Sequence, residues 1–190
     1  FIMMNIEKAD ITGIDAAMTA DVDAAMKQYG FTLADKWILS KMNDLVQEVT
    51  DNMEKFELGI AVSKLYDFLW EEFCDWYIEM VKPRLWDDAD ETKAAALWTL
   101  KTVLTTGLKL LHPYMPFVTE EIYSALVSEE KSLMMSDWPQ FSEDWCYADA
   151  ENITDHMKEV IRGVRNARAE MNVPPSRKAK VYVCLLYTSP

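Results

Sequence analysis

The stretch LYDFLWEEFCDWYIEMVKP, residues 65–83, decides the expected fold because it is apolar on too many sides for a surface helix. On a helix with 3.6 residues per turn, its acidic side chains fall within roughly 140°, and most of its apolar side chains share the remaining roughly 220°. A one-sided amphipathic helix needs an apolar stripe of only about 100°. The sequence therefore predicts a central helix that packs against at least two others and ends at Pro83. Trp76 lies on its expected core face, whereas Phe68 and Ile78 fall toward the acidic side.

The composition of the 190-residue chain is that of a helical globular protein. Half of its residues are hydrophobic and 12% are aromatic, while only five are glycine, which favours bulky helix packing over a turn-rich β fold. No apolar run approaches the ~20 residues of a membrane span, and the N-terminus lacks the pattern of a signal peptide. Three distant cysteines without C-x-x-C spacing predict neither a disulfide framework nor a zinc site, which fits a reducing cytoplasm.

Apolar periodicity predicts four further helices. One covers about 33–55, with Thr32 and Asp35 placed to cap its start. The others cover about 97–111, 116–127 with Pro116 in the first turn, and the region from Asn152 or Thr154 to Met171. The side chains expected to face inward on the last helix are those of Met157, Val160, Ile161, Val164 and Met171.

These elements predict an all-α antiparallel helix bundle with an extra C-terminal helix and the start of a strand. Residues 1–31 are interpreted as the end of a truncated helix and an irregular connecting loop, since residues 7–31 lack a sustained apolar period. Residues 32–149 form the bundle, and 150–183 hold the extra helix and a strand beginning at Val181. Residues 184–190 are expected to be a non-native tail. The loop 128–149 is expected to be held on the bundle by Leu133, Met134, Trp138 and Trp145.

No motif in the sequence indicates catalysis or metal binding. His112 stands beside Pro113 with no Ser, Cys or acidic residue at a pairing distance, so a capping or buried structural role is expected. Neighbouring acids such as Glu120 and Glu121 diverge by about 100° on a helix and do not converge on a metal ion. The glycine-rich motifs that bind phosphate groups are missing, so no cofactor is expected within this chain.

The net charge of −13 disfavours nucleic-acid binding, but the charge is unevenly distributed. Residues 1–150 carry 12 Lys and Arg against 28 Asp and Glu, whereas residues 151–180 carry seven against four. Lys158, Arg162 and Arg165 are spaced i, i+4, i+7 and form a basic ridge within about 60° of the helix surface. Two interpretations remain open: a solvated helix face, or a surface that contacts a nucleic-acid backbone.

Four strings of the sequence carry a resemblance to a known family. They are DKWILS at 35–40, FCDWY at 73–77, LHPYMPF at 111–117 followed by Thr119-Glu120-Glu121, and RAEMNVPP at 168–175. From Phe1 to about Val183, the chain resembles the C-terminal part of the bacterial valyl-tRNA synthetases, which are class I aminoacyl-tRNA synthetases. Isoleucyl and leucyl enzymes share the bundle and a similar His-Pro turn, but the Cys-Asp-Trp-Tyr and Asn-Val-Pro-Pro strings look valyl-like.

The resemblance implies an anticodon-binding helical domain of a cytoplasmic, monomeric valine–tRNA ligase that uses ATP and Mg²⁺. Its implied partners are tRNA(Val) and an upstream catalytic domain; without the catalytic and editing domains, this portion is expected to be inactive. By the same resemblance, Phe1 matches an aromatic side chain that stacks on an anticodon base. Lys158, Arg162 and Arg165 are then expected to contact the tRNA backbone. Without the resemblance, the acidic residues 1–150 would also suit a stand-alone protein-interaction module.

Overall fold

The computed structural model describes residues 2–6, 11–127, 132–174, 176–180 and 182. These residues form helices and connecting segments, with no strand among them, which confirms the all-α prediction. The chain divides into two compact units, Phe1–Thr154 and Asp155–Pro190. The strand expected from Val181 and the tail 184–190 fall on positions outside the described residues, apart from Tyr182, which has no regular structure.

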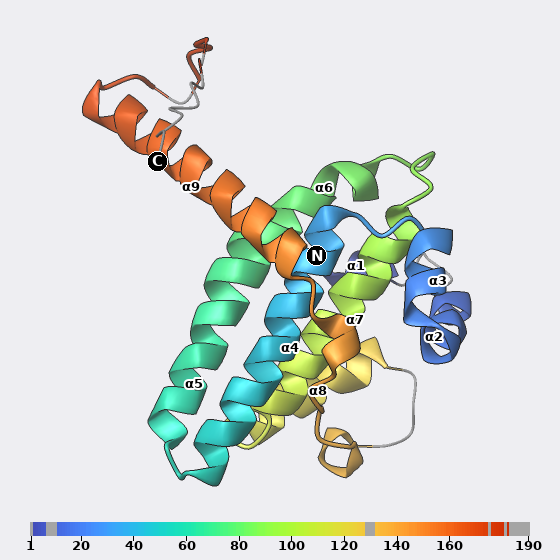
Figure 1. The fold of residues 1–190 in the computed structure, drawn as a ribbon. Coiled ribbons are helices and arrows are strands. Elements are labelled where there is room, and N and C mark those ends of the chain that lie inside the picture. The colour runs from blue at the N-terminus through green and yellow to red at the C-terminus, as the bar shows by residue number, and fades with distance from the viewer. Residues whose placement is uncertain (1, 7–10, 128–131, 175, 181, 183–190) are drawn as a thin grey trace, which may run out of the picture. The chain divides into compact units, whose positions relative to one another are not determined.

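The first unit is a helix bundle centred on α4 (Leu33–Glu54) and α7 (Lys93–Leu111). Helix α4 packs against α7, against α5 (Leu58–Asp67) and against the π-helical segment η1 (Phe68–Tyr77). Figure 1 shows α4 beside α5 as two long helices joined by a short connection. The most fully buried side chains come mainly from α4 and α7, and include Trp37, Ile38, Leu39, Leu97, Leu100 and Val103.

The stretch expected to form the central helix is instead part of a longer one. Segments α5, η1 and α6 (Ile78–Trp86) follow each other without a break, and Pro83 lies inside α6 rather than ending the helix. Phe68 is buried, Trp76 is only partly buried, and Trp70 is exposed. The π-helical hydrogen bonds run from residue i to i+5, so a wheel drawn at 3.6 residues per turn correctly places Phe73 and Tyr77 in the core but misplaces Phe68 and Trp70.

Residues 12–28, expected to be irregular, form the short helices α2 (Thr12–Ala20) and α3 (Val22–Gln28). Asp21 separates them and caps α3, because its carboxylate accepts a hydrogen bond from the backbone N–H of Ala24 at 3.0 Å. The interruption at Asp21 explains why no long apolar period is visible in the sequence. The side chains that anchor the two helices are buried: Ile14, Met18, Ala25 and Met26. A further short helix, α1, covers Ile2–Ile6.

Two predicted helix starts are confirmed. Thr32 and Asp35 form a capping box at the start of α4, with the backbone N–H of Thr32 donating to the Asp35 carboxylate at 2.7 Å. Helix α8 (Pro116–Leu126) begins with Pro116 in its first turn. His112 ends α7, and its Nδ1 lies 2.8 Å from the Thr119 hydroxyl, which fits the expected structural role.

The loop before α9 contains two short 3₁₀ turns, η2 (Leu133–Met135) and η3 (Glu143–Trp145). Polar contacts hold this loop on the bundle. Asn43 exchanges two hydrogen bonds with the backbone of Ser142, at 2.9 and 3.0 Å, and Trp138 donates to the Thr50 hydroxyl at 2.9 Å. Leu133 is buried as expected, but Met134 is 72% exposed.

Helix α9 (Ala148–Glu170) begins before the predicted Asn152 and ends close to the predicted Met171. The prediction that one face of this helix points inward is wrong. Met157, Val160, Ile161 and Met171 are exposed, and Val164 is partly exposed. Helical spacing places these side chains on one face, but burial also needs a second element that packs against that face. Among the described residues of the second unit, α9 is the only helix. Within the described part of the chain, no helix combines the length and the apolarity needed to cross a membrane.

Candidate nucleic-acid interface

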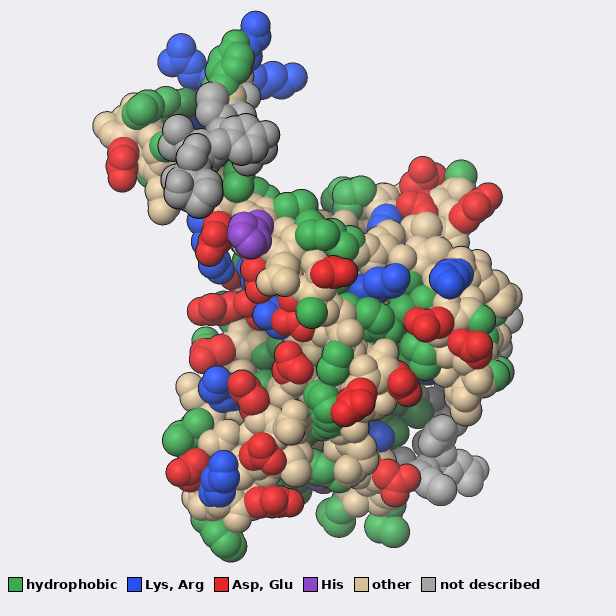
Figure 2. Space-filling model, viewed as in Figure 1, with side chains coloured by type: hydrophobic (Ala, Val, Ile, Leu, Met, Phe, Trp, Pro, Cys, Tyr) green, Lys and Arg blue, Asp and Glu red, His purple; other side chains and the backbone are tan. Residues whose placement is uncertain are grey.

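Basic residues are denser in the second unit of this acidic protein than in the first, and there they outnumber the acidic ones. Residues 155–180 carry seven Lys and Arg against three Asp and Glu. Figure 2 shows acidic side chains scattered over the visible face of the bundle, while Lys and Arg side chains gather in the segment that follows α9. Because nucleic-acid backbones are attracted to Lys and Arg, the second unit is the part of the protein best suited to bind one.

The predicted basic ridge on α9 is only partly exposed. Arg162 and Arg165 are exposed, whereas Lys158 is 3% exposed and its Nζ lies 3.8 Å from the Asp155 carboxylate. The i, i+4, i+7 spacing correctly places the three on one side of the helix, but spacing does not reveal that one position is covered. The exposed ridge therefore consists of Arg162 and Arg165.

Phe1, the predicted stacking residue, lies outside the described residues. Exposed aromatic rings occur elsewhere: those of Tyr66 and Trp70 stack with their centroids 6.3 Å apart, and the two side chains are 63% and 58% exposed. Aromatic rings can stack on bases. However, Asp67 and Glu71 follow these two residues directly in the sequence, and their negative charge disfavours an approaching phosphate backbone.

The sequence interpretation missed a second basic group beyond the end of α9. Arg177, Lys178 and Lys180 are all exposed. Arg168 holds the backbone of this segment, because its Nη2 donates to the carbonyl of Pro174 at 2.8 Å and to that of Arg177 at 2.7 Å. A signal was present in the sequence: residues 171–180 contain three basic residues and no acidic one.

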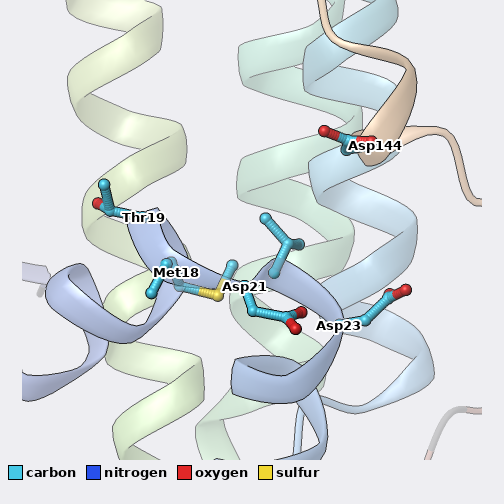
Figure 3. A pocket seen from close by; sticks show the side chains of 7 residues that line it. Met18, Thr19, Asp21, Asp23 and Asp144 are labelled. Atoms are coloured by element: carbon cyan, nitrogen blue, oxygen red, sulfur yellow. The ribbon is translucent and has the colours of Figure 1, made fainter.

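An open cleft of about 330 Å³ lies at the junction of α2 and α3 and has the opposite character. Figure 3 shows Asp21 and Asp23 on the α2–α3 segment and Asp144 on the chain segment near α4. The Asp21 carboxylate already caps α3. The described residues contain no group of three or more His, Cys, Asp and Glu side chains placed to hold a metal ion. The carboxylates make this cleft unsuitable for phosphate groups.

An acidic all-helical bundle followed by a basic helical unit is compatible with an RNA-binding module, and comparison with known proteins specifies which one. The chain belongs to the family of anticodon-binding domains of tRNA ligases, whose model matches residues 35–183.

The curated relatives are valine–tRNA ligases. The chain is 49% identical to the enzyme of Clostridium acetobutylicum over 96% of this chain and 20% of the relative. It is 57% identical to the enzyme of Clostridium perfringens over 80% of this chain and 17% of the relative. It is 51% identical to the enzyme of Clostridium tetani over 82% of this chain and 18% of the relative. The chain thus spans about a fifth of the length of these relatives. These matches do not favour a stand-alone interaction module.

Proposed function

We propose that this chain is the anticodon-binding portion of a cytoplasmic valine–tRNA ligase and that it binds tRNA(Val). The observation that carries the proposal is the family match over residues 35–183, because it covers most of the bundle and most of the basic unit together. The similarity to three valine–tRNA ligases supports valine over isoleucine or leucine as the amino acid of the parent enzyme.

In this proposal the exposed guanidinium groups of Arg162 and Arg165 contact tRNA phosphates. Guanidinium groups suit this role because they remain charged and donate several hydrogen bonds in a planar fork. Buried Lys158 is assigned a structural role beside Asp155 instead. The bundle carries most of the negative charge, so it approaches RNA only where the basic unit compensates.

The chain alone is proposed to be inactive in aminoacylation. Relatives named valine–tRNA ligases are about five times as long, and the sequence has no glycine-rich phosphate-binding motif. ATP and Mg²⁺ are therefore assigned to other parts of the parent enzyme. Valine-dependent exchange of pyrophosphate into ATP by the purified chain would contradict this assignment.

Titration of a tRNA(Val) transcript at low and physiological salt tests RNA binding. We expect affinity to fall steeply as salt rises, because binding releases counterions from the phosphates. The double variant R162E/R165E should bind more weakly than the unaltered chain. A matched control is K64E/K82E, which reverses two partly exposed charges on the bundle that are paired with Glu48 and Glu79. Binding that is indifferent to salt and to the double reversal would overturn the proposal.

A further inference from the structure

Helix α9 ends in a defined helix stop. The backbone N–H of Val173 donates to the Arg168 carbonyl at 2.9 Å, and that of Asn172 donates to the Ala169 carbonyl at 3.0 Å. Asn172 has φ 53°, the left-handed conformation that Asn adopts more readily than most residues. This pair of bonds is a Schellman motif, and Pro174 follows it where prolines commonly occur. The segment after the helix therefore starts from a defined geometry.

Arg168 fixes the continuation of this segment. Its Nη2 donates to the carbonyls of Pro174 and Arg177, at 2.8 and 2.7 Å, so one nitrogen links the backbone at these two residues. The backbone N–H of Arg177 also donates to the Pro174 carbonyl at 3.0 Å, which closes a turn. The side chain of Arg168 thus comes from the helix and organises the loop that follows it.

The segment that follows α9 carries positive charge and no negative charge over residues 171–180. Arg177, Lys178 and Lys180 are exposed, and residues 171–180 contain no Asp or Glu. Figure 2 shows Lys and Arg side chains projecting as a group from the segment beyond α9. Several exposed cations beside a hydrogen-bonded backbone at Pro174 and Arg177 are suited to a polyanion with regularly spaced charges, such as an RNA backbone.

We propose that residues 172–174 and 176–180 form a second phosphate-binding element for RNA, separate from Arg162 and Arg165, and that Arg168 is its positioning residue. This inference rests on the proposed function. Arg168 acts here through the backbone carbonyls of Pro174 and Arg177, and Arg177, Lys178 and Lys180 bind the phosphates. The element binds RNA phosphates without reading base identity, because phosphate contacts position a nucleic acid but do not specify its sequence.

The variant R168K separates geometry from charge. Lysine keeps the positive charge but lacks the planar fork of the guanidinium group, so the turn should loosen while the net charge stays the same. The comparison variant is R165Q, which removes one exposed charge on the same helix. The readout is the slope of log affinity for a tRNA(Val) transcript against log salt concentration. This slope falls by about 1 for each phosphate that the protein no longer neutralises.

We expect R165Q to reduce the slope by about 1 and R168K to reduce it by about 2, since loosening the turn disorders Arg177 and Lys178 together. The double variant R177Q/K178Q should resemble R168K. Hydrogen exchange of the Arg177 amide, measured without RNA, should be faster in R168K than in R165Q, because that amide closes the turn. Circular dichroism checks that α9 remains helical in each variant.

The possible failures can be distinguished. If the unaltered chain binds no tRNA, the proposed function fails and this element fails with it. If the unaltered chain binds tRNA and R168K keeps the full salt slope, only the second element is overturned. Faster exchange at Arg177 without a change in slope would also overturn it, because the turn would then be structural alone. Binding of polyglutamate as tight as binding of RNA would overturn the assignment of RNA as its ligand.

Discussion

Arg84 and Asp35 form a largely buried ion pair between two helices, with Nη1 of Arg84 2.8 Å from Oδ1 and 2.9 Å from Oδ2 of Asp35. The Asp35 side chain is fully buried, and it also accepts hydrogen bonds from Thr32 and from the Tyr77 hydroxyl. Arg84 also contacts the start of α7, because its Nε and Nη2 donate hydrogen bonds to the hydroxyl and the carbonyl of Thr92. The pair therefore links the start of α4, the end of the long helix α5–α6 and the start of α7.

Removing the cation of this pair should be strongly destabilising. R84M leaves the Asp35 carboxylate buried without its counter-charge, and we expect the free energy of unfolding to fall by about 3–5 kcal/mol. The matched control is K64M, which breaks the half-exposed Lys64–Glu48 pair and should cost less than about 1 kcal/mol. Urea unfolding followed by circular dichroism measures both variants. Equal costs for R84M and K64M would contradict the central role of the buried pair.

Tyr77 should make the protein sensitive to alkaline pH. Burial raises the pKa of its hydroxyl well above 10, and the negative charge of Asp35 raises it further. The folded state therefore keeps this proton at pH values where the unfolded state loses it, so the contribution to stability is full below about pH 10 and falls as pH rises above it. The stability gap between the unaltered chain and Y77F should narrow above about pH 10. Y66F, at an exposed tyrosine, is the control. A gap for Y77F that stays constant with rising pH would refute this expectation.

Gly30 is required by the turn that precedes α4. Its φ of +67° is unfavourable for other residues, and an added Cβ would lie 3.0 Å from Cγ2 of Thr92. G30A should therefore destabilise the protein by about 1–2 kcal/mol. Gly59 in α5 is the matched position, because a Cβ there meets nothing within 4 Å. G59A should be neutral or stabilising by up to about 1 kcal/mol in thermal unfolding, since Ala favours helices. A G30A variant as stable as G59A would show that the turn tolerates a side chain.

Phe56, in contrast to Gly30, is a bulky residue in the left-handed conformation. It has φ 59° and lies in the stop between α4 and α5. The stop is again a Schellman motif, with Glu57 donating to the Asn52 carbonyl at 2.8 Å and Phe56 donating to that of Met53 at 3.0 Å. Phe56 is 87% exposed, so replacing it sacrifices little burial. F56G should raise the free energy of unfolding by about 0.5–1 kcal/mol, whereas F56A, which keeps the strain, should not. A gain of equal size in both variants would point to the removal of exposed apolar surface rather than to backbone strain.

The sequence by itself determined the local features of this protein. The Thr32–Asp35 cap, the proline at the start of α8, and the approximate extent of α4 and α7 all follow from interactions between residues a few positions apart. The family strings and the change of charge after residue 150 are also properties of the sequence alone. The existence of a helical bundle with a basic extension was therefore predictable.

The tertiary structure alone decided which side chains are covered. Phe68 turned inward and Trp70 outward because a π-helical segment changes the angular spacing of the long helix. Lys158 became buried while Arg162 on the same side of α9 stayed exposed. Arg84 reached Asp35 across 49 positions, and Arg168 reached two backbone carbonyls beyond its helix. Helical spacing fixes the direction in which a side chain points, but its burial and its partners depend on segments that only the folded chain brings near.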